Sequence, residues 1–255
     1  MKRLELVLLS LLAALGTCQT LAAPPLATPR QPNVVFIFSD DHSIQAIGAY
    51  HTWLSAFCRE HQVTPHIDRL AAQGAVFVNS FCGNSLCSPS RATVLTGLHS
   101  HANGVRRLEQ PITPGLWTYP VSLRQAGYQT AVIGKWHLAT TTPEFDYWRI
   151  LPGQGAYENP AFIGPNGRES HPGYASDVIT DLALDWLKHR DPAKPFFLAV
   201  QHKAPHRNWV PPLRYATWLD DVRITGSSSI GRPSMSSSST LPFMSYCNCS
   251  PMKNL

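Results

Sequence analysis

The chain has 255 residues, of which 44% are hydrophobic, so it can bury a sizeable core as one large domain or a piece of one. Its formal net charge is +5, but most of this excess lies at the two ends. Residues 2–5 contribute +1, and Arg223, Arg232 and Lys253 contribute +3, which leaves +1 for the body between them. The net charge therefore gives no argument for a nucleic-acid partner.

The first residues have the pattern of an export signal. Two basic residues precede an apolar run over residues 4–15, and small residues follow at Ala22 and Ala23. We expect a signal peptide over residues 1–22 and a Pro-rich linker over 23–32. Cleavage near Ala22 is preferred to lipoprotein anchoring at Cys18, because Thr17 is a poor residue before a lipidated cysteine. The apolar run is too short to span a bilayer comfortably, so we expect a periplasmic or secreted chain without stable membrane insertion.

The continuous apolar run over residues 33–38 predicts a strand that is buried on both faces and lies centrally in a parallel sheet. It ends in Asp40 and Asp41. Two adjacent carboxylates at a strand end repel each other unless a cation neutralises them, and such oxygen ligands suit Ca²⁺ or Mg²⁺. An Asp-Asp turn that only caps a helix is the alternative interpretation of the same residues.

Residues 64–74 predict a helix with Thr64 as its cap, Pro65 in its first turn and Gly74 at its end. Its apolar stripe, formed by Ile67, Leu70 and Ala71, is expected to be buried. A short strand over 75–78 should follow and lead toward Cys87. Cys58 and Cys82 are candidates for a disulfide in an oxidising compartment, although their spacing alone cannot show it.

Residues 87–97 predict a short helix that begins at Cys87 and ends at Gly97, with Pro89 in its first turn. Cys87 would lie at the positive end of the helix, where backbone N–H groups favour an anion. Arg91, one turn further on, can point back toward Cys87 as a fixed cation. This arrangement suits chemistry on a small oxyanion; a buried structural cysteine is the alternative.

Two further strands end in titratable residues. Helix 121–127 precedes strand 128–133, which is followed by Lys135 and His137, and helix 175–190 precedes strand 195–200, which is followed by His206. The helix over 175–190 carries three aspartates on one face, which we interpret as solvated rather than metal-binding. Ligands of open α/β sheets bind beyond the carboxyl ends of the strands. We therefore predict convergence at one sheet edge of Asp40, Asp41, Cys87, Lys135, His137 and His206.

Two motifs resemble signatures of the type I sulfatases. They are Cys-x-Pro-Ser-Arg-x-x-x-Leu-Thr-Gly over residues 87–97, and Gly-Tyr-x-Thr-x-x-Ile-Gly-Lys-Trp-His over residues 127–137. The resemblance covers roughly residues 33–219. It implies an α/β fold of the alkaline-phosphatase-like type, with a mostly parallel sheet sandwiched by helices, here incomplete. It also implies a maturation enzyme that oxidises Cys87 to formylglycine, and one Ca²⁺ on Asp40, Asp41 and residue 87, with Mg²⁺ less favoured.

The resemblance also assigns roles. The hydrated formylglycine attacks sulfur and expels the alcohol, and sulfate leaves when the aldehyde reforms. Arg91 and Lys135 stabilise the negative charge of the nucleophile and the sulfate. His137 takes the proton in the release step, and His206 protonates or hydrogen-bonds the leaving oxygen. Residues 145–155 and 202–209 resemble carbohydrate sulfatases, most of all the N-acetylglucosamine-6-sulfatase-like branch. The implied substrate is a sulfated carbohydrate, such as 6-O-sulfated N-acetylglucosamine.

The sequence changes character near residue 223. We expect a partial catalytic domain over 33–222 and a Ser-rich, disordered or frameshifted tail over 223–255. The later Asp-Asn pair and lysine of the family have no credible counterpart, since Asp220 and Asp221 come too early. We therefore expect little or no turnover from this chain. Two alternatives are a phosphatase or phosphodiesterase of the same superfamily, which would carry Ser or Thr at position 87, and an inactive secreted fragment that at most binds sulfated glycans.

Overall fold

The structure is a computed structural model, and it describes residues 31–140, 144–222 and 224. The predicted signal peptide, Cys18 and nearly all of the predicted linker and Ser-rich tail lie outside these residues. Within the described residues, no helix is long and apolar enough to cross a membrane. The unit that contains the sheet begins at Asn33.

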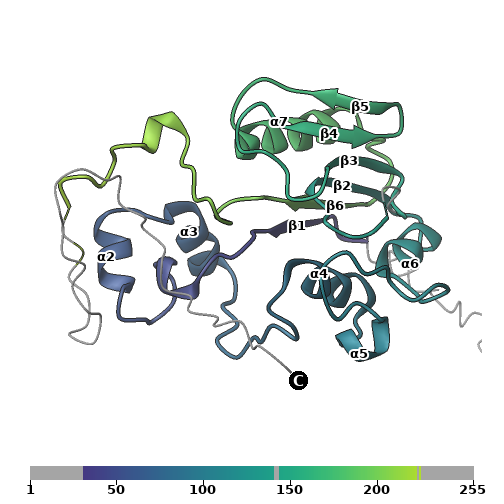
Figure 1. Ribbon diagram of the computed structural model, residues 1–255, viewed down its shortest axis with the longest axis horizontal. Helices are drawn as coiled ribbons and strands as arrows, with labels where there is room; N and C mark the ends of the chain where they lie inside the picture. Colours follow the sequence, from purple (N-terminus) through teal and green to yellow (C-terminus); the bar gives the residue numbers. More distant parts are fainter. Residues whose placement is uncertain (1–30, 141–143, 223, 225–255) are drawn as a thin grey trace, which may run out of the picture. The chain divides into compact units, whose positions relative to one another are not determined.

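A six-stranded sheet organises the described residues, in the order β1-β6-β2-β3-β4-β5 (Figure 1). Its first four strands in this order run parallel, and β4 and β5 form an antiparallel hairpin beside β3. The prediction of an α/β fold with a mostly parallel sheet is confirmed. The strands are β1 (Val34–Phe38), β2 (Gln129–Lys135), β3 (Tyr147–Leu151), β4 (Ala161–Gly164), β5 (Gly167–Ser170) and β6 (Phe196–Gln201).

Helices cover both faces of the central strands. The helical segments of the described residues are η1 (Ile44–Ala46), α2 (Ser55–Glu60), α3 (Pro65–Gln73), α4 (Cys87–Thr96), α5 (Ser100–Asn103), α6 (Tyr119–Gln125), α7 (Ala175–His189) and η2 (Leu213–Tyr215). Because side chains alternate along a strand, Ile133 and Leu198 face α7, where they meet Ile179, while their neighbours Val132 and Ala199 face the side of α4 and α6. These two apolar layers hold β2 and β6 as the centre of the sheet.

The register of the parallel strands brings their carboxyl ends together. Gln201, the last residue of β6, is level with Phe38 at the end of β1 and with Gly134 near the end of β2. The ladder continues one step beyond β1, where the amide of His202 donates to the carbonyl oxygen of Phe38 at 2.8 Å. The polar residues that follow these strands therefore start from one sheet edge.

Strand β1 departs from the sequence prediction. It is parallel, but it is the terminal strand in the described sheet, and only one of its faces is covered. Val35 and Ile37 are 50% and 61% exposed, because α7 contacts β2 and β6 and does not extend over β1. An apolar run cannot by itself distinguish a strand covered on both faces from one whose second face lies open.

Helix α3 has the predicted position, but its surroundings differ from the prediction. Ile67 and Leu70 are exposed, no residue of the helix is buried, and the Thr64 side chain makes no cap hydrogen bond. The Thr64 hydroxyl instead accepts from the amide of Gly48 at 2.9 Å. Apolar periodicity indicates which face of a helix could be covered, but not whether another element covers it.

The segments around α3 differ in part from the predictions. Gly74 ends the helix, as predicted, but with a φ of −134° and not with a left-handed turn. Residues 75–78 form no strand, because no described strand runs beside them to complete a ladder, and Phe77 and Val78 are exposed. Cys58 and Cys82 are both free thiols, the first buried in α2 and the second exposed.

Candidate active site

The first turn of α4 is joined to the segment that follows β2. Leu86 before the helix is extended, Cys87 is the first helical residue, and Gly97 ends the helix with a left-handed φ of 70°, as predicted. The Ser88 hydroxyl donates to the carbonyl oxygen of His137, just beyond β2, at 2.7 Å. This bond places the start of α4, and with it Cys87, against the carboxyl end of the sheet.

Arg91 joins the ends of β2 and β6 at the site. Its guanidinium donates to the carbonyl oxygen of Lys135 and, at 2.8 Å, to the side-chain oxygen of Gln201. It lies 3.6 Å from a carboxylate oxygen of Asp40 and stands over the ring of Phe38 at 5.2 Å from its centroid. Only 5% of Arg91 is exposed, so this cation acts from inside the protein and not on its surface.

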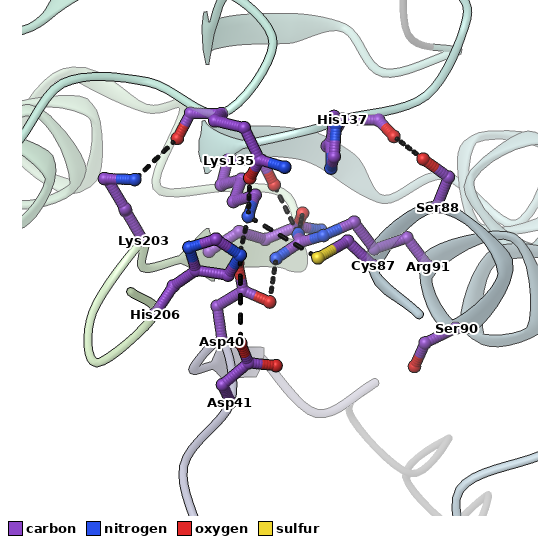
Figure 2. A network of polar contacts seen from close by, with 12 residues as sticks. Asp40, Asp41, Cys87, Ser88, Ser90, Arg91, Lys135, His137, Lys203 and His206 are labelled. Atoms are coloured by element: carbon purple, nitrogen blue, oxygen red, sulfur yellow. Dashed lines mark hydrogen bonds and ion pairs between the residues drawn. The ribbon is translucent and has the colours of Figure 1, made fainter. Parts of the chain in front are cut away.

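Lys135 is the centre of the buried charges (Figure 2). Its ammonium group is fully buried and donates to the carboxylate of Asp40 and to Gln154 Oε1, the latter at 2.6 Å. The same nitrogen lies 3.7 Å from Cys87 Sγ. Burying an ammonium group is costly unless a carboxylate compensates it, and Asp40, itself 6% exposed, supplies that compensation.

Burial raises the pKa of the Cys87 thiol, and the Asp40 carboxylate raises it further, while Lys135 opposes the rise only in part. A thiol with a raised pKa is a poor thiolate nucleophile at neutral pH. The surroundings of Cys87 therefore do not suit a cysteine that reacts as a thiolate. They are compatible with a residue whose chemistry comes from its conversion to another group.

The two predicted histidines face the same place from different segments. Burial lowers the pKa of His137 to about 4, and the cations Lys135 and Arg91 contribute, so the ring is neutral near pH 7. Its Nδ1 is buried and has no hydrogen-bond partner among the described residues. His206 Nδ1 lies 2.6 Å from the carbonyl oxygen of Arg207, which can only accept, so Nδ1 carries a hydrogen and Nε2 is left to face the site.

The structure brings the predicted site residues together at one edge of the sheet (Figure 2). Ligand atoms of Asp40, Cys87 and His206 all lie within 4.8 Å of one another. Asp41 is outside this cluster: its side chain is 56% exposed and lies 3.7 Å from His206 Nε2. Asp41 has a φ of 61°, a left-handed conformation that aspartate tolerates better than most residues.

A hard divalent cation fits part of this donor set. Asp40 and Asp41 offer carboxylate oxygens, and Ca²⁺ takes six to eight oxygen ligands, more than these two residues provide. The Cys87 sulfur stands where a formylglycine would place its oxygen atoms, close to Asp40. The residues present therefore fit a cation at Asp40 together with an oxygen-bearing residue at position 87, whereas Asp41 lies outside this cluster.

Sequence reasoning missed two residues at this site. Gln154 accepts from Lys135, and Lys203 Nζ donates to the backbone oxygen of Gln154 at 3.1 Å. Lys203 lies three residues after the end of the apolar run over 195–200, so its position near a strand end was a usable signal. Gln154 lies in the segment between β3 and β4 and had no such signal.

The α/β fold and the buried charges at its sheet edge define a candidate catalytic centre for an oxyanion, and comparison with known proteins identifies the family. The sulfatase family model matches residues 32–222. The chain belongs to the sulfatase family, whose members use a formylglycine and a divalent metal ion.

Individual relatives agree with this assignment. The chain is 42% identical over 218 residues to an N-acetylglucosamine-6-O-sulfatase of Bacteroides thetaiotaomicron, covering 84% of this chain and 38% of the relative. It is 33% identical over 229 residues to the human N-sulphoglucosamine sulphohydrolase, covering 88% of this chain and 39% of the relative. A solved structure of BT4656 with its substrate D-glucosamine-2-N,6-O-disulfate superposes with a TM-score of 0.72 at 40% identity, covering 78% of this chain and 40% of that one. The chain thus spans about two fifths of the length of these relatives.

Proposed function

We propose that this protein hydrolyses a sulfate ester of a carbohydrate, with 6-O-sulfated N-acetylglucosamine as the first candidate substrate. The observation that carries the proposal is the cluster of Asp40, Cys87, Lys135 and His206 at the sheet edge, within a sulfatase family match. The 42% identity to an N-acetylglucosamine-6-O-sulfatase supports this substrate class.

In this function, a formylglycine at position 87 would supply the nucleophilic oxygen. A Ca²⁺ held by Asp40 and Asp41 would supply positive charge that stabilises the sulfate oxygens. The chain's own residues contribute the rest. Lys135, fixed by Asp40 and Gln154, holds its ammonium beside residue 87 and places positive charge where negative charge develops. Arg91 holds the ends of β2 and β6 and adds a second buried cation.

Proton transfer falls to the two histidines. His137 is neutral near pH 7 because its pKa is lowered to about 4, so it can accept a proton at residue 87. His206 presents Nε2 to the site, beside Asp41, in the position from which a ring nitrogen can hydrogen-bond the leaving oxygen.

The test is release of sulfate from 6-O-sulfated N-acetylglucosamine by the chain made in a host that matures a control sulfatase. We expect sulfate release that depends on Cys87, because residue 87 supplies the nucleophilic oxygen in the proposed function. Equal release by the Cys87→Ala variant would overturn the proposal.

The same assay separates the rival functions. Turnover of a phosphate monoester, with thiol retained at Cys87, would favour a phosphatase of the same superfamily. Binding of the sulfated sugar without any Cys87-dependent turnover would favour a fragment that binds glycans only. We also propose a periplasmic or secreted location, supported by the basic and apolar pattern of residues 2–15.

A further inference from the structure

Gln154 lies at the active site without a role in the chemistry above. Its side-chain Oε1 is 2.6 Å from Lys135 Nζ, and that nitrogen is 3.7 Å from Cys87 Sγ. An ammonium group can only donate, so the amide atom that faces Lys135 has to be the oxygen. The contact with Lys135 therefore determines which way round the Gln154 amide lies.

The other end of this amide is open. Because Oε1 is turned to Lys135, the Nε2 amino group, with its two N–H donors, is directed away from that ammonium. Within residues 31–140, 144–222 and 224, Nε2 has no hydrogen-bond acceptor. Gln154 is also exposed, whereas Asp40, Arg91 and Lys135 are buried. Gln154 is thus the member of this group of contacts that a molecule from solvent can reach.

Gln154 is held from its backbone as well. Lys203 Nζ donates to the Gln154 carbonyl oxygen at 3.1 Å, as the dashed line from Lys203 in Figure 2 shows. Lys203 is 5% exposed, and its ammonium stands 4.7 Å from the ring centroid of Tyr157. The Tyr157 hydroxyl in turn donates to the carbonyl oxygen of His206. Lys135 thus holds the side-chain amide of Gln154 and Lys203 holds its backbone carbonyl. Both contacts lower the conformational entropy that Gln154 would lose on binding a ligand.

The charge around Gln154 favours an anion. Among the residues that the structure describes, Asp40 is the one buried carboxylate here, and it is paired with the buried cations Arg91 and Lys135. Lys203, a third buried cation, contacts the Gln154 backbone. An unpaired N–H donor beside this excess of positive charge needs an acceptor, and the oxygen of an oxyanion is the acceptor that the cations attract.

We propose that Gln154 is a substrate-binding residue that donates an Nε2–H bond to an oxygen of the oxyanion bound beside residue 87. The proposal rests on the proposed function for the identity of that oxyanion as sulfate. Lys135 and Lys203 act as positioning residues for the Gln154 amide.

Two substitutions separate the donor role from other roles. Gln154→Glu keeps an oxygen acceptor for Lys135 but removes the N–H donors and adds a negative charge. Gln154→Met removes both donor and acceptor without changing charge. Gln125→Glu and Gln125→Met are matched controls, since Gln125 is exposed at the end of α6, before the start of β2, whereas the site lies beyond that strand's other end.

The measurement is the Kd of the whole chain for inorganic sulfate, by titration calorimetry at constant ionic strength. Loss of one hydrogen bond to a charged ligand weakens binding by about tenfold or more, so both Gln154 variants should show this loss. The Gln125 variants should bind within about twofold of wild type. With this pattern, an absence of Cys87-dependent sulfate release would refute the proposed function and leave the role of Gln154 intact.

Three results would overturn the inference. If only Gln154→Met weakens binding, Gln154 acts solely by placing Lys135. If only Gln154→Glu weakens binding, the added charge is the cause, and the donor is irrelevant. If the wild-type chain does not bind sulfate, the open N–H group is not part of an oxyanion site.

Discussion

Gly134 offers the most direct test of how the fold sets the site. This residue of β2 is level with Gln201 of β6 and has a φ of 112°. A Cβ atom at this position would lie 1.9 Å from the Gln201 carbonyl oxygen, whereas real Cβ contacts are essentially never shorter than 3.0 Å. Strands β2 and β6 would therefore have to separate by about 1.1 Å. Both neighbours of this contact serve the site, since Lys135 follows Gly134 and the Gln201 side chain accepts from Arg91.

The expected effect of Gly134→Ala follows from these distances. Positive φ in a residue with a side chain costs about 1–3 kcal/mol, and the backbone clash adds to it, so we expect a loss of at least about 4 kcal/mol in the free energy of unfolding. Gly127→Ala is the control, because Gly127 precedes the same strand with a φ of 89° but has nothing within 4 Å of the added Cβ. Both variants change the unfolded chain in the same way, so their difference measures the clash.

The assay is thermal unfolding of the two variants and wild type, followed by circular dichroism. For a chain of this size about 1 kcal/mol corresponds to roughly 2–4 °C, so Gly134→Ala should unfold at least about 2 °C below Gly127→Ala. Equal losses in the two variants would refute the reasoning, because conformational strain alone would then account for both.

Three other predictions concern the charged groups and Cys87. Asp40→Ala leaves Lys135 and Arg91 buried without their carboxylate, so it should lower stability by about 3–5 kcal/mol and weaken calcium binding; equal calcium affinity in a titration would remove Asp40 from the metal site. The pKa of His137 is lowered from 6.5 to about 4 in the folded chain. Between these two pH values, therefore, the unfolded chain binds a proton at this residue and the folded chain does not. Stability should thus fall between pH 6.5 and 4, and the fall should be smaller in His137→Ala; identical pH profiles of melting temperature would contradict this. Peptide mass spectrometry should find formylglycine at position 87, and thiol alone, in a host that matures a control sulfatase, would exclude it.

Sequence patterns predicted the elements whose signals are local. Helix α4 follows from Pro89 and Gly97, and α7 and β6 follow from apolar periodicity and a continuous apolar run. The convergence of Asp40, Cys87, Lys135 and His206 could also be predicted, because parallel strands have their carboxyl ends at the same edge. The chemical roles assigned to these residues stay predictions.

What could not be predicted depends on contacts between distant segments. Whether Val35 and Ile37 of β1 are covered depends on the reach of α7, which no pattern within residues 33–38 encodes. The exposure of Leu70 in α3 is a case of the same kind. Gln154 could not be found because a glutamine in a connecting segment becomes functional only when the fold brings it to Lys135.

The strand order has a consequence for the time at which the sheet can form during synthesis. Strand β6 lies between β1 and β2 yet is made last of the three; Asn33 and Phe196, at the start of the β1–β6 ladder, are 163 residues apart. At about 5–20 residues per second, a ribosome needs roughly 10–30 s to cover that separation. Throughout this interval β1 and β2 lack the strand that joins them, and the apolar residues 34–38 stay without their partner. Early aggregation should therefore depend on how quickly residues 196–201 leave the ribosome, and slowing translation before them should lower the yield of folded chain.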